Sequence, residues 1–161
     1  MSVILASVAF WSPVTFARVG DDGKPEVLKF RTRFKRLRKS ERIALNHRVA
    51  AMAITPEVRE SIQKLIDAPG TDEHQRKFWK DRLAAKPMTD AELLNDIAVD
   101  WDLRNLKGEF VAYTPAIRAE LEEELDGVEG AMVKAYFDAT NAPVTAEDVE
   151  KNSEAQSATT S

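Results

Sequence analysis

The chain has 161 residues, no cysteine and a hydrophobic content of 43%. That length fits one domain and supplies enough apolar side chains for a buried core. Without cysteine there is no disulfide, thiolate metal site or thiol nucleophile, and a reducing compartment such as the cytoplasm is the simplest expectation. The longest apolar run, Val3 to Trp11, is too short to cross a bilayer and follows no basic residue, so neither a membrane anchor nor a signal peptide is expected.

Charge is distributed unevenly along the chain, although the formal net charge is only -4. Residues 1–54 hold 11 Lys or Arg against 4 Asp or Glu, whereas residues 55–161 hold 12 against 23. Such polarity favours an oriented or head-to-tail contact with a partner, and it says little about the fold.

The N-terminal region has the pattern of a β-hairpin. Two segments with alternating apolar residues, 14–19 and 26–34, flank a turn sequence rich in Gly, Asp and Pro. Because strand side chains alternate, one face of the second segment is predicted to enter the core and the other to face water. The predicted core residues are Leu28, Phe30, Thr32 and Phe34. The predicted water-facing residues are Lys29, Arg31, Arg33 and Lys35.

From Ser40 onward the apolar spacing becomes helical. Ser40 is predicted to cap a first helix, and Thr55 with Pro56 to start a second one. Thr71 is predicted to cap a third. The apolar stripe of the first helix is expected to be Ile43, His47, Ala50 and Ile54. The second is expected to bury Val58, Ile62, Leu65 and Ile66. The third carries His74, Phe78, Trp79 and Leu83.

Further helices are indicated in the C-terminal half. Thr89 and Glu92 have the spacing of a capping box, Thr114 and Pro115 start another helix, and Gly127 allows a left-handed closing residue. The apolar side of the helix after Thr89 is expected to consist of Leu94, Ile97, Ala98 and Trp101. The helix after Thr114 is expected to use Ile117, Leu121 and Leu125. The last one, about residues 129–140, is expected to bury Met132, Ala135, Tyr136 and Ala139. Residues 110–113 are predicted to be a small strand or an extended connection.

These elements predict a mainly helical α+β protein, with an N-terminal β-hairpin or small antiparallel sheet followed by about five helices. We expect residues 1–142 to form a single globular domain, β-rich over 1–37 and helical over 38–142. Residues 143–161 contain almost nothing to bury and are predicted to be a disordered polar tail.

No residues have the spacing of a catalytic or metal site. The two histidines, His47 and His74, lie on different predicted helices without a ligand pattern, which favours structural or surface roles. Phosphate-binding loops, nucleophile elbows and zinc spacings are absent from the sequence. We therefore expect neither an enzyme nor a cofactor.

Carboxylates are plentiful, but their positions favour ordinary roles. Asp100 and Asp102 flank Trp101 at a predicted helix end, which favours turn formation. Glu122 to Glu124 lie on the polar side of a predicted helix, where solvation is the simpler interpretation. Carboxylate pairs serve catalysis when burial separates their pKa values, and nothing in the sequence predicts such burial.

The basic segment 29–39 is the strongest candidate binding surface. Seven of its eleven residues are Lys or Arg, interleaved with Phe30 and Phe34, as in some nucleic-acid-binding surfaces. Alternation directs these two rings into the core, so bases would find no exposed ring on which to stack. We interpret the segment as a docking face for an acidic protein segment, with a small nucleic-acid-binding regulator as the alternative. The predicted partner-binding residues are Lys29, Arg31, Arg33 and Lys35.

Two blocks of sequence, in this order, carry a family likeness. The first joins two Phe residues and a basic run to a Ser-Glu helix start, through Phe30, Phe34, Lys35, Arg36, Leu37, Ser40 and Glu41. The second combines a Trp, a Gly turn, a Tyr-Thr helix start and a closing aromatic helix, through Trp101, Gly108, Tyr113, Thr114, Gly127, Ala131, Tyr136 and Phe137. Over most of residues 15–152 this arrangement resembles the tail assembly chaperones of long-tailed bacteriophages.

The resemblance implies a role in tail assembly without catalysis. Members of that family bind the long tape-measure protein, keep its hydrophobic helices soluble and help gather tail-tube subunits around it. They act in the host bacterial cytoplasm and are absent from the mature virion. In many of them a frameshifted longer form recruits the tail-tube protein. The implied partners are therefore the tape-measure and tail-tube proteins, with self-association left open and no membrane.

Overall fold

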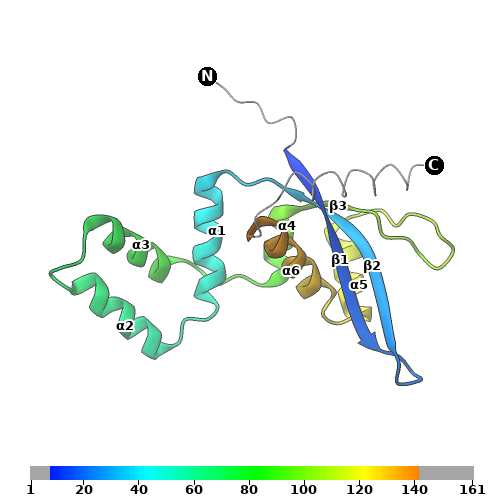
Figure 1. Ribbon diagram of the computed structural model, residues 1–161, viewed down its shortest axis with the longest axis horizontal. Coiled ribbons are helices and arrows are strands. Elements are labelled where there is room, and N and C mark those ends of the chain that lie inside the picture. Colours follow the sequence, from blue (N-terminus) through cyan, green and yellow to red (C-terminus); the bar gives the residue numbers. More distant parts are fainter. Residues whose placement is uncertain (1–7, 142–161) are drawn as a thin grey trace. The chain divides into compact units, whose positions relative to one another are not determined.

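A computed structural model describes residues 8–141 of the protein (Figure 1). The predicted fold class is confirmed, since residues 8–141 form a hairpin within a three-stranded antiparallel sheet together with six helices, which is a mainly helical α+β arrangement. The predicted tail, residues 143–161, lies outside the described part. In chain order the elements are β1 (Ala9–Val19), β2 (Pro25–Lys35), α1 (Lys39–Ala51), α2 (Pro56–Asp67), α3 (Glu73–Ala84), α4 (Asp90–Ile97), β3 (Ala98–Trp101), α5 (Pro115–Glu124) and α6 (Val128–Asn141).

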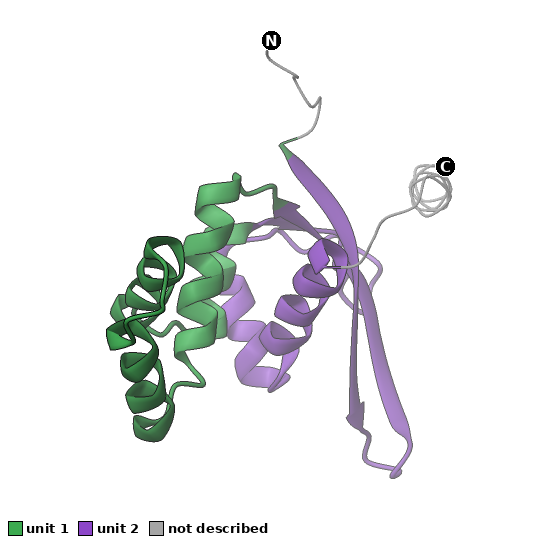
Figure 2. Ribbon diagram, turned by 60° about the vertical axis from the view of Figure 1, so that its left-hand side comes forward, with its two compact units in different colours: residues 1–8, 35–97 green, residues 9–34, 98–161 purple. Residues whose placement is uncertain are grey.

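The chain divides into two compact units (Figure 2). Unit 1 comprises residues 1–8 and 35–97, and unit 2 comprises residues 9–34 and 98–161. Unit 2 is therefore built from two segments that are far apart in the sequence. The single domain expected over residues 1–142 stays a prediction, and hydrophobic patterning did not indicate this division.

In unit 2, β1 and β2 form the predicted hairpin. Gly23, in the turn, has φ 77°, a left-handed conformation that glycine adopts without steric cost. Along β2, Phe30, Thr32 and Phe34 are buried and Lys29, Arg33 and Lys35 are exposed, so the predicted alternation is confirmed for these residues. Leu28, predicted to be in the core, and Arg31, predicted to face water, are both half-buried. The hairpin turn and the alternating pattern are local features, which explains why the sequence predicts both.

A third strand continues the sheet where the sequence predicted the end of a helix. β3 pairs antiparallel with β2, with Trp101 opposite Thr32 and Asp100 opposite Arg33. The prediction that Ala98 and Trp101 lie on the helix after Thr89 is wrong in this respect, although Trp101 is buried as expected. The backbone groups of these residues pair with β2, and a helical apolar period cannot reveal such long-range pairing.

The core of unit 2 lies between the sheet and the last two helices. α6 packs against β1 and α5 (Figure 1). The Ser12 hydroxyl donates to the Ala135 carbonyl oxygen at 3.2 Å. Gly127 has φ 101° in the turn before α6, so its predicted left-handed conformation is confirmed. Of the residues predicted to be buried in α6, Ala139 is half-buried. The other three are buried, namely Met132, Ala135 and Tyr136.

α5 begins as predicted but buries a different residue. The Thr114 hydroxyl accepts from the Ile117 N–H at 3.0 Å, and Pro115 is the first helical residue. The predicted stripe is half-buried along its length, namely Ile117, Leu121 and Leu125. The buried residue of α5 is Arg118. Residues 110–113 form an extended connection, with an isolated bridge between Phe110 and Arg104.

In unit 1, the helix starts are partly as predicted. Thr55 caps α2, and Thr89 and Glu92 form the capping box before α4. The predicted caps Ser40 and Thr71 are wrong. Ser40 lies inside α1, which begins after Arg38, and Asp72 caps α3 by accepting from the Gln75 N–H at 2.8 Å. A carboxylate adjacent to the predicted threonine makes that cap.

The apolar faces of α1 to α3 are less buried than predicted. Of the stripe predicted for α1, His47 is buried, Ala50 is half-buried and Ile43 is 43% exposed. α2 buries Ile62 and Ile66, but not Val58 and Leu65. α3 buries none of its residues, including Phe78. α4 is different, because it buries Leu93, Leu94 and Ile97.

Candidate partner-binding surface

The outer face of the sheet in unit 2 is the strongest candidate surface. α6 packs on the face that carries Ser12 and Phe34. The opposite face carries the predicted cations of β2. We define the outer sheet face by Trp11, Lys29, Arg31, Arg33, Asp100 and Asp102. The fourth predicted cation, Lys35, is the exposed last residue of β2 and belongs to unit 1.

Arg31 is held in place at the centre of this face. The Asp102 carboxylate accepts from the Arg31 Nε at 2.6 Å and from the Arg31 backbone N–H at 2.5 Å. On its other side, the guanidinium carbon lies 5.5 Å from the centroid of the Trp11 ring, within the range of a cation–π contact. Both members of the ion pair are half-buried. Asp102 therefore joins β3 to β2, and the turn-forming role predicted for it is wrong.

Lys29 and Arg33 remain available to a partner. Both are exposed, and neither forms an ion pair within the described residues. A hollow of about 410 Å³ lies beside Lys29, and Pro13, Arg31 and Asp102 also line it. The outer sheet face thus combines accessible cations with a fixed arginine and a shallow recess.

Trp11 is the residue that the sequence interpretation overlooked. The two rings of β2, Phe30 and Phe34, are buried as predicted. Trp11 comes from β1 and is half-buried beside Arg31, so this face carries an aromatic ring that the sequence interpretation did not consider. Alternation along β1 carried the signal, because Ser12, Val14 and Phe16 are buried and the intervening positions 11, 13 and 15 therefore lie on the other face of the strand.

His47 has a structural role in unit 1. Its Nδ1 accepts from the Arg82 Nε at 3.0 Å, and its ring centroid lies 4.9 Å from that of Phe78. Burial, followed by the nearby Arg82 charge, lowers the pKa of His47 below its ordinary value. A neutral imidazole is what accepts this hydrogen bond. His47 thus contacts an arginine and an aromatic ring, an arrangement that contains no reacting group.

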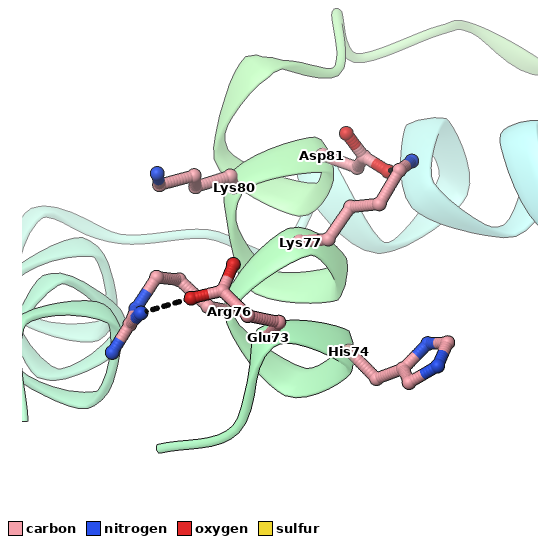
Figure 3. A pocket seen from close by; sticks show the side chains of 6 residues that line it. All are labelled: Glu73, His74, Arg76, Lys77, Lys80 and Asp81. Atoms are coloured by element: carbon pink, nitrogen blue, oxygen red, sulfur yellow. Dashed lines mark hydrogen bonds and ion pairs between the residues drawn. The ribbon is translucent and has the colours of Figure 1, made fainter. Parts of the chain in front are cut away.

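His74 lies on the exposed surface of α3. It lines a depression of about 420 Å³ formed by residues of that helix alone (Figure 3). Glu73 pairs with Arg76 at 2.5 Å, and Lys77 pairs with Asp81 at 3.0 Å, so most of these charges are neutralised locally. Such solvated pairs on one helix do not form an enclosed reaction site.

The carboxylates at the end of α5 divide into two kinds. Glu122 accepts from the Gly127 N–H at 2.9 Å and from the Glu129 N–H at 2.7 Å, which caps the start of α6. Glu123 and Glu124 are exposed. The predicted exposure to water thus applies to Glu123 and Glu124, whereas Glu122 has a capping role that the sequence interpretation missed.

Among residues 8–141, no group of three His, Asp or Glu side chains is placed to hold a metal ion. In the same part of the chain, no helix is long and apolar enough to span a membrane. No protein-family model, curated protein or solved structure matches the chain.

Proposed function

We propose that the chain is a tail assembly chaperone of a long-tailed bacteriophage and acts by binding rather than catalysis. One observation supports this most: the two Phe residues of the first sequence block contact aromatic residues of the second block in the core of unit 2. The Phe30 ring lies 6.1 Å from that of Trp101, and the Phe34 ring lies 5.4 Å from that of Tyr136. Aromatic residues that carry the resemblance and lie far apart in the sequence thus pack together in one core.

Exposed apolar side chains in unit 1 offer a binding surface for helices. Five of them, on α1 to α3 or at the end of α1, are 41–55% exposed: Ile43, Met52, Val58, Leu65 and Phe78. Amphipathic helices commonly dock through such apolar strips, and burial of their area drives the contact. The proposed partner, a tape-measure protein, is long, helical and hydrophobic, and would cover them.

The rest of the proposal follows from the resemblance. The chain would keep the tape-measure protein in solution within the host bacterial cytoplasm and help recruit tail-tube subunits, with or without a longer frameshifted form. It would leave before the virion is complete. None of these steps requires a cofactor.

The alternative, a nucleic-acid-binding regulator, has weaker support. Accessible Lys29 and Arg33 and the half-buried Trp11 favour it. Asp100 and Asp102, however, place two carboxylates among these cations and would repel phosphates. An acidic protein surface can be accommodated more easily, since its side chains can be arranged around the two carboxylates.

The test is co-expression with the tape-measure protein of the same phage. We expect the chain to keep that protein in the supernatant and to copurify with it at about 0.5 M salt, because apolar burial persists where surface charges are screened. Val58→Asp with Leu65→Asp should abolish copurification, because both side chains are exposed on α2. The matched control, Arg59→Asp alone, makes the same change in net charge at an exposed polar position of the same helix and should still copurify.

Two results would contradict the proposal. The first is aggregation of the tape-measure protein despite a folded chain. The second is recovery of nucleic acid in its place, with binding that decreases steeply as salt increases. Far-ultraviolet circular dichroism of each variant separates loss of binding from loss of folding.

A further inference from the structure

We propose that copies of this chain associate head-to-tail through unit 2, with the acidic end of α5 in one copy docked on the outer sheet face of the next. The acidic end of α5 is defined by Glu120, Glu123, Glu124 and Asp126. The inference concerns the chain alone and does not rest on the proposed function.

The acidic end of α5 carries charges that its own copy does not balance. All four carboxylates are exposed, and none forms an ion pair within the described residues. The last turn of α5 contains no basic residue. Carboxylates at a helix C-terminus face the negative end of the helix dipole, so cations supplied from outside would stabilise them.

The outer sheet face carries the complementary charges. Lys29 and Arg33 are exposed there without an ion pair among the described residues, and Arg31 is oriented by Asp102 beside Trp11. Tryptophan and arginine are enriched among the residues that contribute most to protein interfaces. Accessible cations surrounding a fixed Arg–Trp contact therefore suit an acidic protein surface.

The spacing of the two groups is compatible. Lys29 and Arg33 lie four residues apart on one strand, which separates their Cα atoms by about 13 Å. Glu120 and Glu124 lie about 6 Å apart along the helix axis. Long Lys and Arg side chains can converge over this difference. Within one copy, no ion pair among the described residues joins these two cations to these two carboxylates. A second copy can supply the opposite charge to each group.

The two contacting surfaces are different, so the association is heterologous. Each added copy leaves one outer sheet face and one acidic end exposed, and the contact therefore propagates into a chain or closes into a ring. Because the contact depends mainly on accessible charges, salt should weaken it strongly.

The test is sedimentation velocity of the purified full chain across a concentration series. At about 50 mM salt we expect the mean mass to rise with concentration, and at about 0.5 M salt we expect a monomer. Lys29→Glu with Arg33→Glu, or Glu120→Lys with Glu123→Lys, should each give a monomer at low salt. An equimolar mixture of these two variants should associate again, since each retains the surface that the other has lost.

Controls separate a specific interface from a change in net charge or folding. Arg59→Glu with Lys80→Glu makes the same charge change on exposed positions of unit 1 and should associate like the parent. Lys29→Gln with Arg33→Gln avoids placing a glutamate opposite Asp100 and should still weaken association. A parent that stays monomeric at low salt, or a variant mixture that stays monomeric, would overturn the proposal. So would a parent that associates unchanged at both salt concentrations.

Discussion

Arg118 on α5 donates from Nε to Oε1 of Glu129 on α6 at 2.7 Å, and the two side chains are 2% and 10% exposed. The Arg118 Nη1 also donates to the Tyr113 hydroxyl at 2.9 Å. This buried ion pair connects the two helices on the inner side of the sheet. Neither charge can be left alone in the core without a large desolvation cost.

Removing one member of this pair should therefore be strongly destabilising. We expect Arg118→Met to lower the free energy of unfolding by about 3–5 kcal/mol, because Glu129 would be a buried charge without its partner. The double variant Arg118→Met with Glu129→Met should recover most of that loss. Urea denaturation of the three proteins measures both effects. A single variant as stable as the parent would mean that Glu129 reaches water or another partner.

Trp101 is predicted to be a main contributor to the core of unit 2. It is 3% exposed, and its indole N–H donates to the Val111 carbonyl oxygen at 2.8 Å. Trp101→Ala should cost about 3–5 kcal/mol through the cavity it leaves. Trp101→Phe retains a ring and should cost less. Thermal or urea unfolding measures the stability of each protein, which should fall from the parent to Trp101→Phe to Trp101→Ala. Equal melting temperatures for the parent and the alanine variant would refute the prediction that Trp101 stabilises the core.

Replacing Thr32 with valine is expected to increase the stability of the protein. It is fully buried in β2, and its hydroxyl has no hydrogen-bond partner within the described residues. Valine has nearly the same shape and removes an unsatisfied buried polar group, so Thr32→Val should stabilise the protein by about 1 kcal/mol. Chemical denaturation provides the measurement. Thr32→Ser keeps the hydroxyl and loses a methyl group, and it should be less stable than the parent.

His47 should make stability depend on pH in a defined direction. Its pKa is lowered in the folded state, first by burial and then by Arg82, whereas the unfolded value is about 6.5. As pH falls below about 6.5, His47 binds a proton more readily in the unfolded state than in the folded state. The contribution of neutral His47 to the free energy of unfolding is therefore present above that pH and is lost below it. His47→Gln should show a smaller decrease between pH 7 and pH 5 than the parent. His74→Gln should behave like the parent, since His74 is exposed.

The sequence predicted features that depend on neighbouring residues. The hairpin turn at Gly23, the cap at Thr55, the capping box at Thr89 and the glycine at 127 each involve hydrogen bonds or dihedral angles within a few residues. The alternation along β2 is equally local. Residue types and spacing are sufficient to recognise such features, because the interactions that stabilise them occur within the same short segment.

The remaining features depend on residues that are distant in the chain. Asp102 reaches Arg31 across 71 positions, and this contact converts an expected helix end into part of a sheet. Arg118 is polar by type, yet it is buried because Glu129 supplies the opposite charge inside the same core. Periodicity assigns a face by hydrophobicity alone. The partner that makes a charged side chain favourable in a core, or pairs a strand edge, exists only after distant segments have packed together.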